Sequence, residues 1–310
     1  MTSAVSAAPA ALRTLVAGVV DYAGLFPPAA LDMSSAVANY AQFRASHDAW
    51  MLGRFVVPVS RLDDWSAAVR ALSAAERSAW SGARLSALLS GEFSREAEQI
   101  SACNAAEAFG VRIDVAEGRT GTPDTVLATA AAMPDDVMLY CELPHRDDPQ
   151  ELLQAVKSAH VRAKIRTGGV TPDVFPAPHE IIRFLRRCVE IGVTAKATAG
   201  LHHPLRGDYR LTYAPDAIRG TMYGYLNVFL AAAALRAGVS DDEAFAILLA
   251  TDPVAISFAD GAVVVAGVSV SEAALSGARR DGVVAFGSCS FREPVDELVV
   301  LLTGSASALT

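Results

Sequence analysis

The sequence is poor in lysine, in basic runs and in long hydrophobic runs. Only three of its 26 Lys and Arg residues are lysines, and no run of five or more basic residues occurs. With a net charge of −8, the chain lacks the basic face typical of proteins that bind a phosphate backbone, so we expect no nucleic-acid partner. The longest apolar run, near residues 228–235, is too short to cross a bilayer, and we expect no membrane association.

Cysteine patterns and cofactor motifs are also missing. The four cysteines are widely separated and form no CxxC pair, which argues against a zinc cluster or a disulfide framework and favours a reducing cytoplasm. The Ala-rich first 20 residues lack the basic start and the cleavage site of a signal peptide. No glycine-rich nucleotide motif follows the first predicted strand, and we expect no cofactor.

What the sequence does contain is a regular alternation of short β-rich runs and longer helical patterns. Hydrophobic residues make up 52% of the 310 residues and charged residues 19%, which is typical of a folded protein with a large core. Strand patterns cover residues 19–23, 54–59, 84–89, 111–116, 137–143, 162–167, 194–198 and 283–286. Strands that alternate with helices predict a parallel sheet, and eight of them favour an α/β fold of the (β/α)8 TIM barrel type.

We expect one domain, residues 1–310, with two additions to a minimal barrel. The connection after the seventh strand, residues 199–221, is long enough to predict a functional lid over the C-terminal mouth of the barrel. We expect it to bring His202 or His203, and Arg206 or Arg210, to a ligand. Residues 240–281 predict an accessory helix–hairpin–helix insertion that packs on the barrel, with its turn at Asp260–Gly261.

The strongest chemical signal is the position of two lysines. Lys164 and Lys196 occupy similar contexts in consecutive predicted strands, in a chain that otherwise uses arginine almost throughout. Arginine does not lose its proton in a protein, whereas a lysine can act as a neutral amine. Keeping lysine at these two positions indicates amine chemistry.

Strand alternation places further polar side chains with these lysines. Lys164 and Arg166 are predicted to point into the barrel from strand six, and Glu142 from strand five. Asp114 or Glu117 enters from strand four, depending on the register, and Asp114 is our candidate catalytic residue there. The alternative is a purely structural salt-bridge network in the barrel interior.

Two segments carry a family resemblance. Residues 163–169, Ala-Lys-Ile-Arg-Thr-Gly-Gly, and residues 193–200, Val-Thr-Ala-Lys-Ala-Thr-Ala-Gly, resemble the paired-lysine segments of deoxyribose-phosphate aldolase-type class I aldolases. The resemblance covers about 40 residues and implies a barrel in which Lys164 forms a Schiff base and Lys196 lowers its pKa. The sequence after Gly200, which begins Leu-His-His-Pro, departs from that family.

Several other residues are candidates for substrate binding. Small polar residues after the last strands suit an anion, because loops after barrel strands seven and eight commonly bind phosphate. The candidates are Asp21, Arg166, Gly168, Gly169, Thr198, His202, His203 and Ser288. Cys289 also follows the last strand, but the sequence offers it no obvious partner base.

Three functions remain open at this stage. The first is an aldolase-like lyase that uses Lys164, with Glu142 or Asp114 moving protons, on a small anionic carbonyl compound. The second is a metal-assisted hydrolase or lyase that uses His202 or His203 with Glu142, Glu117 or His145, although no metal-binding spacing supports a metal. The third is a non-catalytic barrel that binds an anionic metabolite or assembles with a partner. The sequence does not fix the oligomeric state, and a homo-oligomer is compatible with it.

Overall fold

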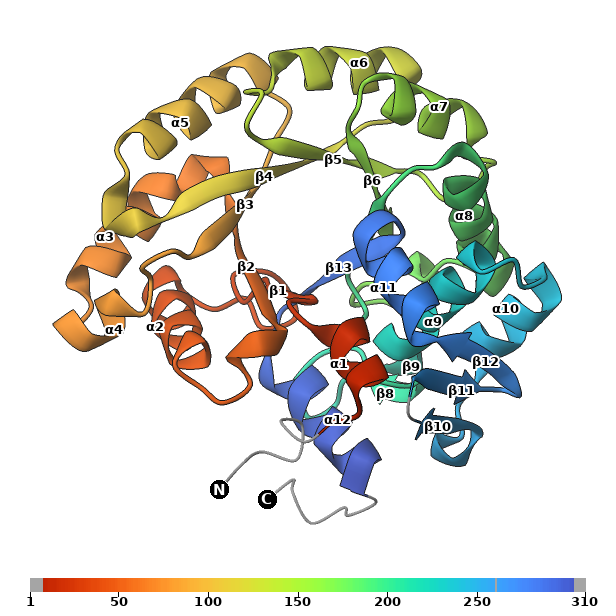
Figure 1. Cartoon of the computed structure of the whole chain (residues 1–310). Helices are drawn as coiled ribbons and strands as arrows, with labels where there is room; N and C mark the ends of the chain where they lie inside the picture. The colour runs from red at the N-terminus through yellow and green to blue at the C-terminus, as the bar shows by residue number, and fades with distance from the viewer. Residues whose placement is uncertain (1–7, 260, 304–310) are drawn as a thin grey trace.

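Eight parallel strands close into a barrel, which confirms the predicted (β/α)8 fold (Figure 1). The structure, a computed structural model, describes residues 8–259 and 261–303. Around the barrel, neighbouring strands follow the order β1-β13-β7-β6-β5-β4-β3-β2. Their bounds are β1 (Val20–Tyr22), β2 (Leu52–Pro58), β3 (Arg84–Leu88), β4 (Arg112–Arg119), β5 (Met138–Leu143), β6 (Arg162–Arg166), β7 (Ala195–Thr198) and β13 (Val283–Ser288).

The apolar core lies between the strands and the helices that surround them. Outward-facing residues such as Ala163, Ile165 and Ala197 are fully buried against helices, which leaves the alternate positions to face the barrel interior. None of the helices in the described ranges is both long and apolar enough to span a membrane. The surrounding helices are α2 (Met33–Arg44), α3 (Leu62–Ala71), α4 (Ala74–Ser78), α5 (Phe93–Ala105), α6 (Pro123–Ala132), α7 (Gln150–Ser158), α8 (Pro178–Ile191), α9 (Tyr225–Arg236) and α12 (Arg292–Thr303).

The segment between β7 and β13 carries the additional elements. A two-stranded hairpin, β8 (Gly207–Arg210) and β9 (Arg219–Met222), lies within the long connection after β7. Helix α9 follows and is buried along almost its whole length, because α8, α10 (Asp241–Leu249) and α11 (Glu272–Asp281) pack against it. Between α10 and α11 lies a three-stranded antiparallel sheet of β10 (Ile256–Ala259), β11 (Ala262–Val265) and β12 (Val268–Ser271), whose predicted turn residue Asp260 falls outside the described residues.

Strand β4 contains a register shift that affects the barrel interior. Leu85 of β3 pairs with Ile113, but the next residue, Ser86, pairs with Val115, so Asp114 is an extra residue on β4. Such a bulge interrupts the strict in–out alternation of side chains along a strand. Asp114 and Glu117, three positions apart, consequently both contact side chains that face the barrel interior.

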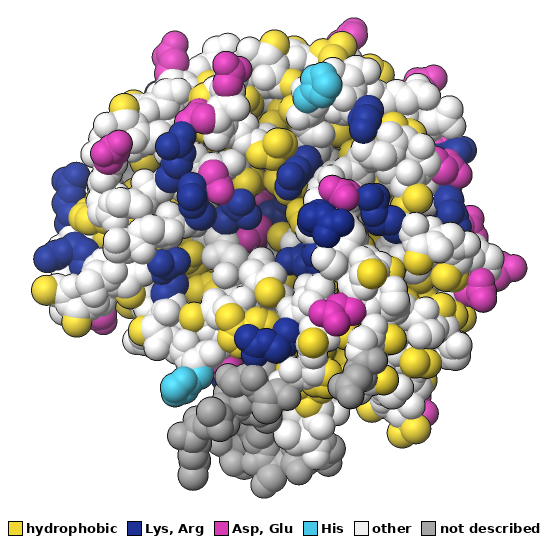
Figure 2. All heavy atoms as spheres, in the orientation of Figure 1, with side chains coloured by type: hydrophobic (Ala, Val, Ile, Leu, Met, Phe, Trp, Pro, Cys, Tyr) yellow, Lys and Arg dark blue, Asp and Glu magenta, His cyan; other side chains and the backbone are white. Residues whose placement is uncertain are grey.

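Figure 1 looks at the end of the barrel where α1 (Ala10–Val16) and α11 lead into β1 and β13. Lys and Arg side chains gather around the centre of this face (Figure 2). Arginines lie at or near the start of four barrel strands. One of them, Arg54, forms a bidentate ion pair with Asp114. A cavity at the other end of the barrel, where the strands finish, has charged residues in its lining that include Lys164, Arg166 and Glu117.

Candidate active site

The register of β6 and β7 places the two lysines side by side in the barrel interior. Lys164 and Lys196 are directly paired positions of these neighbouring parallel strands. Both side chains are almost completely buried, with 4% and 2% of their surface exposed. Two buried ammonium groups require negative charge close by, because an unpaired buried charge is very costly.

Glu117 of β4 supplies that charge to both lysines. Its Oε2 lies 2.7 Å from Lys164 Nζ and its Oε1 lies 2.6 Å from Lys196 Nζ, while the Ser86 hydroxyl donates to Oε1 at 2.5 Å. Burial alone would raise the pKa of Glu117, but the charges of Lys164 and Lys196 outweigh burial and hold the pKa well below its usual range. Glu117 is therefore an anionic bridge between the two amines.

Lys196 belongs to the closed, inner part of this network. Its Nζ also lies 2.6 Å from Asp21 Oδ2 of β1 and sits 5.5 Å from the centre of the Tyr140 ring. Burial lowers the pKa of Lys196, but Asp21 and Glu117 more than compensate and raise the pKa above its usual value. Asp21 further accepts from the backbone N–H of Arg54 at 2.7 Å. Lys196 and Asp21 thus form a buried ion pair beneath the surface of the site.

Lys164 instead lies on the cavity side of Glu117, where its amine contacts a second carboxylate. Glu142 Oε2 of β5 lies 2.8 Å from Lys164 Nζ, and Glu142 Oε1 lies 3.2 Å from Arg166 and 3.5 Å from Arg119. Burial would raise the pKa of Glu142, but Lys164 and the two arginines hold the pKa below its usual value. The sequence predicted Glu142 and Arg166 at this place, whereas Arg119 was not anticipated.

A cavity of about 360 Å³ opens above Lys164 at the C-terminal ends of the strands. Its charged lining combines Lys164, Arg166, Arg119 and His202 with a single carboxylate, Glu117. Such a lining favours an anionic ligand, and the apolar part of the wall leaves room for a short hydrocarbon portion. The remaining lining residues are Ala23, Phe26, Pro27, Pro28, Val56, Leu88, Gly169, Val170, Thr198, Ala199, Gly200, Gly287 and Cys289.

His202 lies in a cluster of polar groups beside this cavity. Its Nδ1 is 3.3 Å from Glu293 Oε2, 3.3 Å from Ser288 Oγ and 3.8 Å from Cys289 Sγ. Burial lowers the pKa of His202, but the contacts with Cys289 and Glu293 outweigh burial and raise the pKa to about 10. The Tyr213 hydroxyl donates to Glu293 at 2.8 Å and connects the long loop to this cluster.

Several predicted site residues lie elsewhere. Asp114 pairs with Arg54 at 2.7 Å, and the place beside the lysines is taken by Glu117. His203 is stacked on Tyr209 and lies 2.8 Å from Glu297 of α12, so of the two adjacent histidines only His202 is among the residues that line the cavity.

The loops after β6, β7 and β13 all border the cavity. Gly169, Gly200 and Cys289 of these loops line it, as do Thr198 of β7 and Gly287 of β13. Gly168 and Ser288 are not among the lining residues. A Cβ atom at Gly168 would lie 2.4 Å from the Phe175 ring, and Ser288 is buried against His202. Asp21, proposed as a binding residue, serves instead as the partner of Lys196 beneath the cavity floor.

The residues considered for a metal are not gathered in one place. His145 pairs with Glu180, while His202 and His203 pair with Glu293 and Glu297. Across residues 8–259 and 261–303, no group of three or more His, Cys, Asp and Glu side chains has an arrangement that could hold a metal ion.

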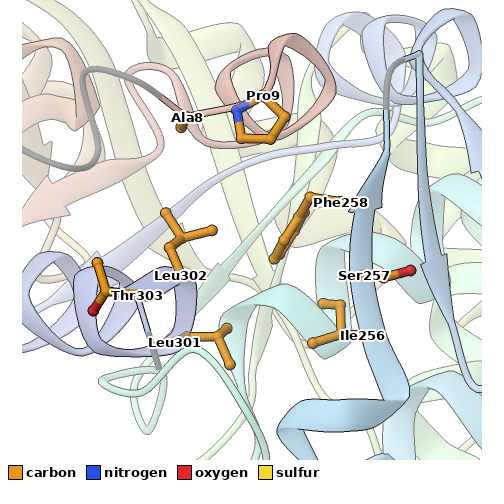
Figure 3. A pocket seen from close by; sticks show the side chains of 8 residues that line it. All are labelled: Ala8, Pro9, Ile256, Ser257, Phe258, Leu301, Leu302 and Thr303. Carbon is orange, nitrogen blue, oxygen red and sulfur yellow. The ribbon is translucent and has the colours of Figure 1, made fainter. Parts of the chain in front are cut away.

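A second hollow, of about 380 Å³, lies at the surface between β10 and the end of α12 (Figure 3). In this close-up the side chains of Phe258 and Ile256 face Leu302 and Leu301 across the hollow, whereas Ser257 points away. None of its lining residues carries a titratable side chain. This hollow therefore offers a ligand no ionisable group.

No model of a known protein family matches this chain, and no curated protein is significantly similar to it in sequence. The function must therefore be inferred from the residues of the barrel mouth.

Proposed function

We propose that this protein is an enzyme that forms a Schiff base between Lys164 and a small anionic carbonyl compound, in the manner of a class I aldolase or a related lyase. One observation carries the proposal. Of the three lysines, all in the described part of the chain, Lys164 alone lines the cavity, with a carboxylate on each side of its amine. Barrel enzymes place their chemistry at this end of the strands.

The first step follows from the neighbours of Lys164. Its ammonium must lose a proton before nitrogen attacks a carbonyl carbon, and Glu142 Oε2, 2.8 Å away, is placed to take it. One N–H proton of the attacking amine and the proton that Glu142 took then pass to the carbonyl oxygen, which leaves as water, and an iminium remains. That iminium withdraws electrons from the adjacent bond and promotes carbon–carbon cleavage or isomerisation.

Substrate charge makes this proton transfer easier. Lys164, Arg166 and Arg119 together hold the pKa of Glu142 low, which makes Glu142 a weak base while the two arginines contact it. A substrate carboxylate or phosphate that binds these arginines draws positive charge away from Glu142. We therefore propose that anion binding and activation of Lys164 are coupled.

Lys196 has a supporting role in this scheme. Its charge is held by Asp21 and Glu117, and it keeps Glu117 ionised and fixed beside Lys164. The buried cation also adds positive potential near the reacting amine. Lys196 does not line the cavity, so it acts on the reaction only through its neighbours.

Borohydride trapping tests the proposal directly. The protein is incubated with a panel of small keto acids, aldehydes and phosphorylated sugars, reduced with borohydride, and mapped by peptide mass spectrometry. We expect a reduced adduct on Lys164 and none on Lys157, which is bound to the Gly192 carbonyl on the outer surface and serves as an internal control. Adducts spread over Lys157, or no adduct on Lys164 with any carbonyl compound, would overturn the proposal.

A matched pair of variants separates catalysis from simple anion binding. Lys164→Arg keeps the charge but cannot form a Schiff base, whereas Lys157→Arg changes only the surface. We expect Lys164→Arg to abolish trapping and turnover and to retain anion binding, and Lys157→Arg to behave as the wild type. A Lys164→Arg variant with full turnover would show that the lysine is only part of an anion clamp.

A further inference from the structure

Cys289 is a second nucleophilic side chain on the wall of the same cavity. It follows β13 directly and lines the cavity, although only 5% of its surface is exposed. Its sulfur lies 3.8 Å from His202 Nδ1 and 3.5 Å from the Tyr213 hydroxyl. His202 and Tyr213 come from the long connection after β7 and Cys289 follows β13, and the three residues meet at one point of the barrel mouth.

Cys289 lies beside a cationic side chain and a helix N-terminus. Because its pKa is raised to about 10, His202 is an imidazolium at neutral pH; its Nδ1 lies 3.8 Å from the sulfur, and Glu293 at 3.3 Å balances its charge. Cys289 also precedes the N-terminus of α12, where the Ser290 hydroxyl accepts from the Glu293 N–H. Both an imidazolium and a helix N-terminus stabilise the negative charge of a nearby thiolate.

We propose that Cys289, activated by His202, is an independent nucleophile that adds to the electrophilic carbon of a small anionic α,β-unsaturated carbonyl compound. In this addition the sulfur forms a bond to the β-carbon, and the electron pair of the double bond moves toward the carbonyl group. The imidazolium of His202 donates a proton to the α-carbon. Atoms and charge balance without an oxidant or a reductant.

The lining of the cavity selects this ligand class. Lys164, Arg166 and Arg119 favour a carboxylate or phosphate on the ligand, and Lys164 can polarise its carbonyl group. The choice of a carbonyl ligand rests on the proposed function of Lys164, whereas the reactivity of Cys289 does not. The two ideas can therefore fail separately.

Competitive alkylation measures the reactivity of the thiol. Iodoacetate and iodoacetamide both alkylate a thiolate with loss of iodide, but only iodoacetate is anionic. Peptide mass spectrometry follows Cys289 and the half-buried Cys103 of α5 in the same sample. We expect the iodoacetate-to-iodoacetamide rate ratio to be about tenfold higher at Cys289 than at Cys103, because the cationic cavity concentrates the anion. Equal ratios, or slower labelling of Cys289 by both reagents, would overturn the proposal.

Two variants assign the effect to its cause. His202→Gln removes the imidazolium beside the sulfur and should slow labelling of Cys289 at neutral pH about tenfold or more, with no change at Cys103. Lys164→Arg should abolish borohydride trapping while Cys289 is still labelled. Unchanged labelling of Cys289 in a folded His202→Gln protein would contradict the role of His202, and the wild-type rate ratio remains a test if this variant does not fold.

The ligand class is tested with 4-oxopent-2-enoate, which carries a ketone, a conjugated double bond and a carboxylate. We expect a stable adduct on Cys289 without borohydride in the wild type and in Lys164→Arg, and no such adduct in Cys289→Ala. An adduct confined to Lys164 would refute conjugate addition by Cys289 and leave the Schiff-base proposal intact. An adduct on Cys289 with no trapping on Lys164 by any carbonyl compound would refute the Schiff-base proposal alone.

Discussion

Glu117 Oε1 and Lys196 Nζ lie 2.6 Å apart inside the barrel, and the other oxygen of the same carboxylate contacts Lys164. One buried carboxylate thus serves two buried ammonium groups. This arrangement connects the barrel interior, where Lys196 meets Asp21, to the cavity that Lys164 lines. Both the stability of the barrel and the position of Lys164 should depend on Glu117.

Replacing Glu117 with Gln should destabilise the protein strongly. The substitution keeps the shape but leaves the two ammonium groups short of one negative charge, and breaking a buried ion pair in this way costs about 3–5 kcal/mol. Chemical denaturation measures the loss. Glu98→Gln on the exposed face of α5 is the control and should change the free energy of unfolding by less than about 0.5 kcal/mol. Equal effects of the two substitutions would show that the bridge adds nothing.

The pH dependence of this effect has a defined sign. The pKa of Glu117 is lower in the folded protein than its ordinary value of 4.5, so its stabilising contribution is present above pH 4.5 and declines as the pH falls below it. The difference in unfolding free energy between the wild type and Glu117→Gln should therefore shrink in acid. A difference that grows below pH 4.5 would contradict this assignment.

His202 should give the opposite pH dependence. Its pKa is raised from 6.5 to about 10 by Cys289 and Glu293, which outweigh its burial. Its stabilising contribution is therefore complete below pH 6.5 and is lost as the pH rises through about 10. Between pH 7 and pH 10, we expect the wild type to lose a few kcal/mol relative to His202→Gln, on the order set by the size of such a shift. The exposed His179→Gln is the control, and a parallel decline in all three proteins would refute the prediction.

Gly200, which lines the cavity, should not tolerate a side chain. It has a φ of +72°, and a Cβ atom there would lie 2.9 Å from the backbone of Gly168. Gly18 has a similar φ of +58°, but a Cβ atom at that position would have no neighbour within 4 Å, so Gly18 isolates the conformational cost. We expect Gly18→Ala to cost about 1 kcal/mol and Gly200→Ala about 2–4 kcal/mol, measured by thermal or chemical unfolding. Equal losses of stability in Gly18→Ala and Gly200→Ala would mean that the backbone at Gly168 moves aside for the added methyl group at no cost.

Arg166 should contribute to anion binding more than to folding. It lies at the cavity and contacts Glu142, and about a third of its side chain is exposed. Arg166→Met should weaken the binding of small carboxylates or phosphate, measured by calorimetry, by about tenfold. Arg95→Met on the exposed surface of α5 is the control. Unchanged anion affinity in Arg166→Met would place the anion elsewhere.

The sequence was sufficient to predict the barrel and the pairing of its two lysines. Alternation of strands and helices predicts the parallel barrel, and the matching positions of Lys164 and Lys196 in consecutive strands predict that they are neighbours. Glu142 follows from the in–out alternation of β5. These features depend on local periodicity, which a single sequence displays.

Other parts of the site depend on long-range contacts that periodicity does not reveal. Glu293 contacts His202 from a distant part of the sequence. His202 likewise becomes the partner of Cys289 only when the chain folds. The long loop contributes His202 to the cavity lining, whereas Arg206 and Arg210 are not among the lining residues. The sequence also did not decide whether Asp114 or Glu117 lies beside the lysines, because regular alternation cannot turn both residues inward. The backbone register of β4 decides it.

The extra residue in β4 determines which changes of strand length this site tolerates. Between the positions that pair with Leu85 and Leu88 of β3, strand β4 has one residue more than β3. Deletion of Asp114 would therefore leave Glu117 opposite Leu88 and beside both lysines, and it would remove the partner of Arg54. For this protein, replacement of Glu117 is a more severe mutation than loss of the residue that lengthens its strand. Homologues that keep both lysines should keep Glu117, whereas the extra residue can be lost together with the arginine at position 54.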